Sequence, residues 1–174
     1  AGITAADSSL PTDIQAQNLN AEFNPMTEST TVTWHNINTG DIEIAQLLKD
    51  SRYLVYRHDS QMNASMVENE TVLPFANISA CIGAVVECPG QQHQVEYLLP
   101  PGVNDSYYYG VVSLFANGSI RALLEVGSAQ TGMGVWEFTN DITAPFNVNA
   151  SYDPETSRTF IQWINLNELL PGTL

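Results

Sequence analysis

Basic residues are scarce in this sequence. Lysine and arginine together number 5 among 174 residues, against 19 aspartates and glutamates, which gives a formal charge of −14. Proteins that bind nucleic acids hold the phosphates with lysine and arginine, so this balance argues against nucleic acids and, for the same reason, against anionic membrane surfaces. No apolar run approaches the roughly 18 residues that a membrane-spanning helix needs. We therefore expect no nucleic-acid partner and no membrane insertion.

Residues that bind metals are also few. The two cysteines, Cys81 and Cys88, lie seven positions apart, which is not the redox C-x-x-C spacing, and two thiols alone cannot form a structural zinc site. In an oxidising compartment the pair favours a disulfide, and two buried free thiols are the alternative. The three histidines, His35, His58 and His93, lack the spacing of metal ligands, and strand alternation predicts that His35 faces solvent. We expect no metal site.

Signatures of catalysis are missing as well. No G-x-S-x-G motif occurs, and the glycine-rich segment 127–134 lacks the G-K-[ST] ending of a phosphate loop, which is typical of a linker. Glu137, Asp141 and Asp153 lie where calcium can clamp neighbouring modules, although no D-x-[DN]-x-[DN]-G loop is present. Trp136 is expected to pack at the same module boundary. We expect no catalytic residue and no enzymatic activity.

Motifs for asparagine-linked glycosylation, or sequons, are abundant. Six Asn-x-Ser/Thr tripeptides occur, none with proline in the middle, whereas independent placement of the same residues predicts roughly two. The six asparagines are Asn63, Asn69, Asn77, Asn104, Asn117 and Asn149. We interpret the excess as N-glycosylation, which implies a secreted or cell-surface protein; the alternative is that Asn, Ser and Thr simply favour turns. Covalent N-glycans are the only non-protein groups that we expect.

The chain reads as short strands separated by turns. Residues 30–36 alternate between polar and apolar, and residues 52–57 are rich in β-formers. Residues 106–115 place five side chains on one face of a strand: Tyr107, Tyr109, Val111, Ser113 and Phe115. Only residues 41–50 suggest a short helix or irregular insertion, with Ile42, Ala45 and Leu48 in its apolar stripe. The pattern predicts an all-β antiparallel sandwich.

The sequence repeats itself near its two ends. Residues 30–38 (TTVTWHNIN) and 159–167 (TFIQWINLN) share T-x-[VI]-x-W-x-N-[IL]-N at an offset of 129 residues. Upstream, residues 11–16 and 145–150 share P-x-x-[IV]-x-A, and a short I-T-A match precedes each of them. Three matches in the same order, with nearly equal offsets, indicate duplicated modules.

These motifs carry a family resemblance. A proline-led first strand, a second strand that ends in Trp34, a third strand at Tyr53–Arg57 and an L-x-P-G turn before alternating tyrosines resemble the fibronectin type III branch of the immunoglobulin-like sandwiches. The resemblance implies that Trp34 is the core tryptophan of the second strand. It also implies that Tyr107 is the buried corner tyrosine of the sixth strand, with Leu99 and Gly102 in the preceding turn.

We expect three parts along the chain. Residues 1–126 form the fibronectin type III-like sandwich, in which residues 58–95, with the cysteines and three sequons, are a long insertion. Residues 127–144 form a linker, and residues 145–174 form the first strands of a partial second module. An isolated hairpin is marginal in water. Four apolar side chains of this module therefore need a partner and are the predicted subunit interface: Phe146, Val148, Ile161 and Trp163.

Two explanations of the partial module stay open. Either the chain belongs to a longer tandem array, or its last strands complete a sheet of another subunit by β-strand addition. If the protein ends at Leu174, we expect the second arrangement, which propagates into an open homopolymer of identical copies. The sequence thus predicts a non-enzymatic structural subunit of a glycosylated extracellular filament that assembles head-to-tail, similar in type to glycosylated fibrils with immunoglobulin-like subunits. A carbohydrate-binding or adhesive accessory module of a larger secreted protein is the alternative.

Overall fold

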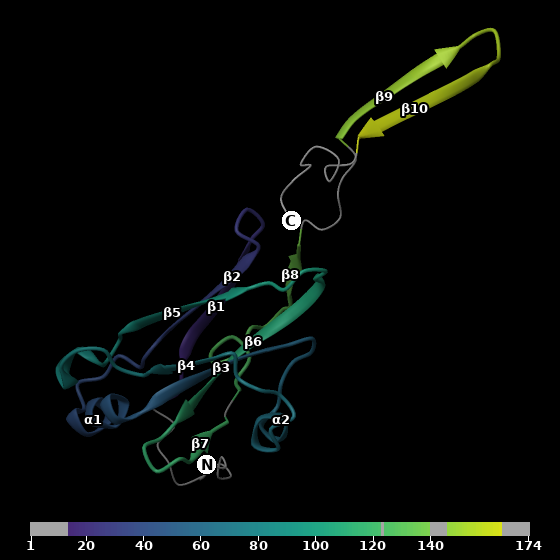
Figure 1. The fold of residues 1–174 in the computed structure, drawn as a ribbon. Coiled ribbons are helices and arrows are strands. Elements are labelled where there is room, and N and C mark those ends of the chain that lie inside the picture. Colours follow the sequence, from purple (N-terminus) through teal and green to yellow (C-terminus); the bar gives the residue numbers. More distant parts are fainter. Residues whose placement is uncertain (1–13, 123, 140–145, 165–174) are drawn as a thin grey trace, which may run out of the picture.

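The computed structural model describes residues 14–122, 124–139 and 146–164 (Figure 1). These residues form mostly antiparallel strands with few helices, which confirms the predicted all-β sandwich. No helix in the described part of the chain is both long and apolar enough to cross a membrane. The strands divide between two packed sheets and a separate hairpin.

Three strands form the first sheet. They are β1 (Gln17–Asn24), β2 (Ser29–His35) and β5 (Gln92–Leu98), in the order β1-β2-β5. Strand β2 lies in the middle and pairs antiparallel with both neighbours. Its predicted alternation is confirmed, because Val32 and Trp34 are fully buried while the residues between and beside them are partly exposed. One face of the sheet therefore packs on the core.

The second sheet has β3 (Arg52–His58) and β6 (Asn104–Leu114) at its centre. Strand β4 (Ala76–Ser79) pairs with β3, β7 (Ile120–Arg121) pairs with the end of β6, and β8 (Val135–Phe138) pairs with the beginning of β6. The order is β4-β3-β6-β7, with β8 also on β6. Strand β8 lies in the segment expected to be a linker, so the sandwich extends further along the chain than expected.

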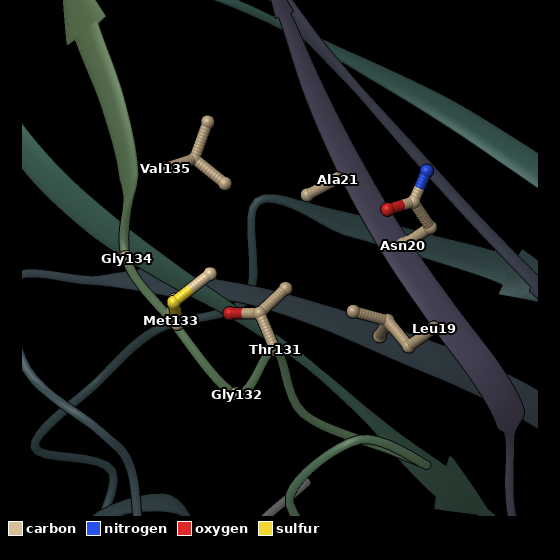
Figure 2. A pocket seen from close by; sticks show the side chains of 8 residues that line it. All are labelled: Leu19, Asn20, Ala21, Thr131, Gly132, Met133, Gly134 and Val135. Carbon is tan, nitrogen blue, oxygen red and sulfur yellow. The ribbon is translucent and has the colours of Figure 1, made fainter.

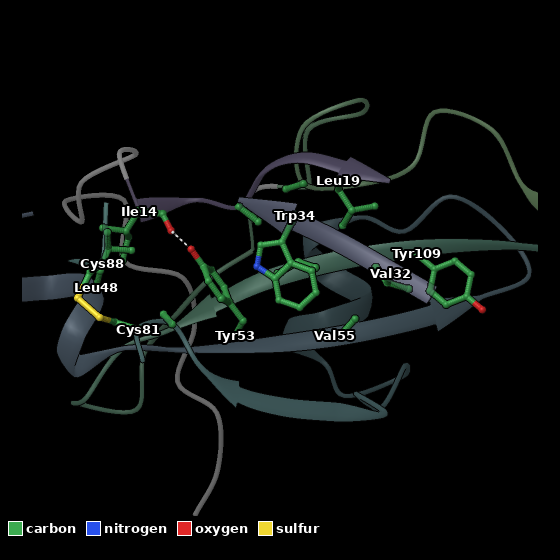
Figure 3. Close-up of a cluster of buried hydrophobic side chains, with 14 of the residues drawn as sticks. Ile14, Leu19, Val32, Trp34, Leu48, Tyr53, Val55, Cys81, Cys88 and Tyr109 are labelled. Atoms are coloured by element: carbon green, nitrogen blue, oxygen red, sulfur yellow. Dashed lines mark hydrogen bonds between the residues drawn. A yellow bond between two sulfur atoms is a disulfide. The ribbon is translucent and has the colours of Figure 1, made fainter. Parts of the chain in front are cut away.

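The main core lies between the two sheets (Figure 3). Trp34 from β2 meets Tyr53 from β3 edge-on, with ring centroids 5.6 Å apart. The inward face of β6 is as predicted, but the expectation for Tyr107 is wrong: Tyr107 is only partly buried, and Tyr109 is the tyrosine of this strand that is fully buried. Alternation sets which face a side chain points to, whereas the distance from the end of the sheet sets how deeply it is buried.

A second, smaller core covers the outer face of the second sheet. Leu54 and Tyr56 of β3 cluster there with Val112 of β6 and with Val67 of helix α2 (Ala64–Glu68). Strand β3 is thus buried on both faces, which explains why it reads as a continuous apolar run without alternation.

Helix α1 (Ile42–Asp50) occupies the connection between β2 and β3, and confirms the short helix suggested for this segment. Asp41 caps its first turn, because the Asp41 Oδ1 accepts a hydrogen bond of 2.8 Å from the backbone N–H two residues later. Ala45 and Leu48 are buried, but Ile42 is 61% exposed and does not belong to the buried stripe.

The expected insertion, residues 58–95, is partly built into the sandwich. It contains α2, β4, the single-turn 3-10 helix η2 (Val85–Glu87) and the start of β5. Cys81 and Cys88 form the predicted disulfide across η2. A short covalent loop therefore closes this segment just before it enters the first sheet.

Strands β9 (Phe146–Asp153) and β10 (Arg158–Ile164) form an antiparallel hairpin. Among the described residues it pairs with neither sheet, and Figure 1 shows it apart from both. The strands predicted for the beginning of a second module are therefore present.

The first hairpin, β1–β2, and the second hairpin, β9–β10, are similar in sequence and in strand pairing. Residues 20–38 and 149–167 are identical at eight of nineteen positions without a gap, which extends the repeat well beyond the nine residues of its best-matched part. Val32 and Ile161 hold equivalent positions, each facing an alanine on the partner strand. The irregular pairing toward the open end of the first hairpin also recurs in the second.

The turns of the two hairpins match as well. Asn24 and Asp153 each accept a hydrogen bond of 2.9 Å through Oδ1 from the backbone N–H two residues later. The last turn residue has a positive φ in both, 51° at Glu28 and 54° at Ser157. Because turn geometry fixes hairpin register, the repeat specifies the same hairpin twice.

Candidate functional site

The hairpin β9–β10 exposes apolar side chains at positions that are covered in the first hairpin, β1–β2. Ile161 is 58% exposed, whereas Val32 is 0% exposed. Tyr152 is 64% exposed, whereas its counterpart Phe23 packs edge-on against Phe138 of β8, with ring centroids 5.1 Å apart. The difference lies in what surrounds each hairpin, since their own structures are the same.

Ile161 is the one member of the predicted interface whose side chain the structure describes. Phe146, Val148 and Trp163 lie in β9 and β10, but their side chains fall outside the described part of the chain. Phe160, on the opposite face from Ile161, is 51% exposed. The hairpin therefore has an exposed apolar side chain on each face.

Trp34 is the largest side chain of the first hairpin that the rest of the sandwich buries, and Figure 3 shows it beside Tyr53 of the opposite sheet. The indole stacks on the imidazole of His93 from β5, with centroids 5.5 Å apart, and meets the Tyr53 ring edge-on. Burial lowers the pKa of His93, so the imidazole stays neutral in the core. This stacking needs both the neighbouring strand β5 and the opposite sheet.

Asn36 follows β2 and anchors the end of the first hairpin in a buried polar socket. Its Nδ2 donates hydrogen bonds of 2.7 Å to the backbone carbonyls of both Ala80 and Cys88. Its Oδ1 accepts one of 2.7 Å from the Tyr53 hydroxyl and lies 3.1 Å from His93 Nε2. The disulfide segment and both sheets thus meet at one amide.

A buried ion pair fixes β8 to both sheets. Glu137 is 0% exposed and accepts hydrogen bonds of 2.9 and 2.6 Å from Arg57 Nε and Nη2 on β3. Thr30 on β2 donates to the same carboxylate at 2.5 Å, and the Tyr109 hydroxyl on β6 donates as well. Burial by itself would lower the pKa of the Arg57 guanidinium, but the bonds to Glu137 raise it overall. The guanidinium also lies over the Tyr107 ring, 3.3 Å from its centroid.

The acidic residues considered for calcium are not brought together. Glu137 is enclosed in the ion pair just described, and Asp153 is bonded within its own hairpin turn. Asp141 lies outside the described residues. Among residues 14–122, 124–139 and 146–164, no group of three or more His, Cys, Asp or Glu side chains is placed to hold a metal ion.

All six sequon asparagines are exposed. Asn63 caps helix α2, and its Oδ1 accepts bonds from the Ser65 hydroxyl at 2.6 Å and from a backbone N–H at 3.1 Å. Asn117, in the turn after β6, makes the same 2.6 Å contact with the Ser119 hydroxyl. In both sequons the carbonyl oxygen of an exposed asparagine is bonded to the hydroxyl of the same sequon.

Asn77 lies on β4, at an edge of the second sheet. Its Oδ1 accepts a hydrogen bond of 2.5 Å from Arg52 Nε on the neighbouring strand. Edge strands are the places where sheets of different molecules pair. A sugar on Asn77 would stand at such an edge.

The described sandwich has a shallow pocket between β1 and the segment before β8 (Figure 2). Its volume is about 420 Å³. Aliphatic side chains, small polar side chains and glycines line it: Leu19, Asn20, Ala21, Thr131, Gly132, Met133, Gly134 and Val135. No aromatic or charged side chain is among them, so the pocket offers neither a sugar-stacking ring nor a catalytic group.

No family model matches the chain, and no curated protein matches it either. The exposed hairpin and the sequons therefore carry the functional interpretation. One sequence expectation needs correction here: Trp136 is 56% exposed instead of packed. His35 lies on the outward face of β2, as predicted, and is partly exposed there. Sequence reasoning also missed Asn36 as an anchoring residue, although the N-[IL]-N end of the repeat contained it.

Proposed function

We propose that this chain is a non-enzymatic, structural part of a glycosylated extracellular filament made of repeated sandwiches. The hairpin β9–β10 forms the first two strands of the next sandwich and is completed by strands from outside the described residues, in a head-to-tail row. One observation carries the proposal: Ile161 is 58% exposed at the position where Val32 is 0% exposed in the same hairpin of the first sandwich. An exposed copy of a core element needs a partner.

The order of the strands supports a fibronectin type III-like sandwich. The first, second and fifth strands form one sheet, while the third and sixth pair at the centre of the other, with the fourth at its edge. Sandwiches of this kind are used repeatedly as rows of modules in cell-surface proteins. The buried Trp34 on the second strand fits the same interpretation.

An extracellular location is supported by two kinds of residue. Disulfides persist in oxidising compartments, and Cys81 and Cys88 form one. The sequon asparagines are all exposed, as acceptance of a glycan requires. Sugars at Asn77 and beside α2 would hinder lateral pairing of sheets and leave the axial contact free.

A carbohydrate-binding or adhesive module is the second candidate. The exposed indole of Trp136, at 56%, favours it, because sugars stack on exposed aromatic rings. The pocket of Figure 2 contributes no aromatic ring to such a site. Retention of the protein on immobilised oligosaccharides, lost in Trp136→Ala, would favour this second function.

The test of the filament is made on protein isolated from its natural source. We expect elongated particles that are visible by electron microscopy, a mass that falls on deglycosylation, and slow hydrogen exchange in β9 and β10. Recombinant 1–174 serves as the comparison, and its hairpin should exchange fast. A compact natural monomer with unmodified sequons and a fast-exchanging hairpin would refute the proposal.

A further inference from the structure

The partner of the C-terminal hairpin can be specified further, on the basis of the proposed function. We infer that hairpin β9–β10 is covered by a half-sandwich equivalent to strands β3–β8 of this chain, which has no first hairpin of its own. The first hairpin shows what such a cover contains, through the contacts of Thr30, Trp34 and Asn36.

The second hairpin keeps the residues through which the first one binds its cover. Trp34, which stacks on His93 and Tyr53, has its counterpart in Trp163 at the same offset. Asn36, which fills the polar socket, has its counterpart in Asn165.

Thr30 bonds the Glu137 carboxylate, and the offset of 129 places Thr159 at the equivalent position. Asparagine is disfavoured in and beside strands unless its amide is bonded, so its recurrence points to a second socket of the same chemistry. The partner should therefore present an aromatic ring and an imidazole to the tryptophan, and a hydroxyl and two backbone carbonyls to the asparagine. It should also present a buried carboxylate to the threonine.

The faces of the second hairpin agree with this assignment. Ile161 points to the face that is buried in the first hairpin, through its counterpart Val32. Asn149 corresponds to Asn20, and Ser151 to Glu22, both of which are exposed in the folded sandwich. A glycan on Asn149 would therefore remain outside when the hairpin is covered.

A complete second copy of this chain is a poorer partner. Its place beside β5 is already filled by β1 and β2. A visiting hairpin would have to displace an equivalent one, so the apolar area newly buried would equal the area newly exposed and no net hydrophobic gain would result. A half-sandwich without a first hairpin removes this competition.

The direct test is an extended chain in which residues 1–167 are followed by residues 39–139 of the same sequence. This supplies β3–β8 a second time without a second β1–β2, and residue 39 follows Asn167 as it follows Asn38. A thiol introduced by Ile161→Cys reports on cover, since Cys81 and Cys88 are bonded to each other. We expect the thiol to react at least ~100-fold more slowly in the extended chain than in 1–174, because reaction then requires opening of the sandwich.

Ser151→Cys is the matched control, since its counterpart Glu22 is exposed. Its thiol should react equally fast in both chains. Equal reaction of the position-161 thiol in both chains would overturn the inference. So would protection of that thiol in 1–174 itself together with a doubled mass, because a complete second copy would then be the cover.

If the extended chain fails to fold its second sandwich, a grafted hairpin tests the inference instead. Residues 149–167 replace residues 20–38 in the first sandwich, and a cooperative unfolding transition is expected. A graft of residues 148–166 into the same place is shifted by one residue, which reverses the faces, and should not fold. An unfolded in-register graft overturns the inference.

The outcomes are separable from those of the proposed function. Protection at position 161 in the extended chain stands even if the natural protein proves to be an unglycosylated monomer. Natural filaments together with an unprotected thiol leave the filament intact and remove only the half-sandwich partner.

Discussion

Replacement of Glu137 by glutamine should lower the free energy of unfolding of the sandwich more than most single substitutions do. The change keeps the shape of the side chain but removes the charge that faces Arg57. Glu137 has no exposed surface and the Arg57 side chain is only 12% exposed, so solvent cannot compensate the guanidinium that is left unpaired. The Thr30 and Tyr109 hydroxyls also lose an ionised acceptor.

The expected cost follows from buried ion pairs in general. Removal of one partner typically costs about 3–5 kcal/mol, and a whole domain is stable by about 5–15 kcal/mol. With a urea m-value of about 2 kcal/mol/M, a loss of about 4 kcal/mol moves the unfolding midpoint down by about 2 M. Strand β8, which carries Glu137, should show the largest rise in hydrogen exchange.

The assay is urea unfolding followed by tryptophan fluorescence, with Asp59→Asn as control. Asp59 is 70% exposed beside His58, so its loss should change stability by less than about 0.5 kcal/mol. The double variant Arg57→Met with Glu137→Leu removes both charges and should be more stable than Glu137→Gln alone. A loss below about 1 kcal/mol in Glu137→Gln would show that the carboxylate is not the buried anchor described here.

Four further outcomes are expected. Serine at both Cys81 and Cys88 should lower the free energy of unfolding by about 2.5 kcal/mol, by the chain-entropy cost of so short a loop, in urea titrations of oxidised and variant protein. Burial lowers the pKa of His93, so below about pH 6.5 the unfolded chain binds a proton at this residue more readily than the folded chain does. The free energy of unfolding should therefore be highest above that pH and fall below it, and the fall should be smaller in His93→Gln. Val32→Asp should abolish the cooperative unfolding transition of 1–174, whereas Ile161→Asp should change the free energy of unfolding by less than about 0.5 kcal/mol, since only the first position is buried. Peptide mapping of natural material should find sugar on at least three of the six sequons, and unmodified peptides at all six would remove the support for an extracellular protein.

Much of the sandwich could be predicted because its strands alternate. Residues 30–36 bury one face and leave the other partly exposed, so period-two patterning located Val32 and Trp34 in the core. The same signal placed the inward face of β6. The burial of Tyr107, which the family resemblance implied, was wrong, since Tyr107 is only partly buried; alternation placed its face but contains no information about how near a residue is to the end of the sheet.

The features that escaped prediction depend on contacts between distant segments. Glu137 pairs with Arg57 across 80 positions, and no local pattern connects them. The outer face of β3 is buried because helix α2 folds over it, and a short helix between turn-forming residues has no strong signal of its own. The candidate site was more readable, since the repeat located the hairpin and the sequons are local motifs.

The chain contains the same hairpin in two environments, and this separates what the sequence of a hairpin determines from what its partner adds. Register and turn recur in both, through the side-chain bonds of Asn24 and Asp153 and the positive φ of the last turn residue. Burial does not recur, because it needs β5 and the opposite sheet. At about 25 cal/mol per Å² of apolar surface, the cover of an isoleucine and a tryptophan is worth several kcal/mol, more than an isolated hairpin possesses. Local turn chemistry thus forms the β9–β10 hairpin, and under the proposed function the stability of a second module comes from the strands that cover this hairpin.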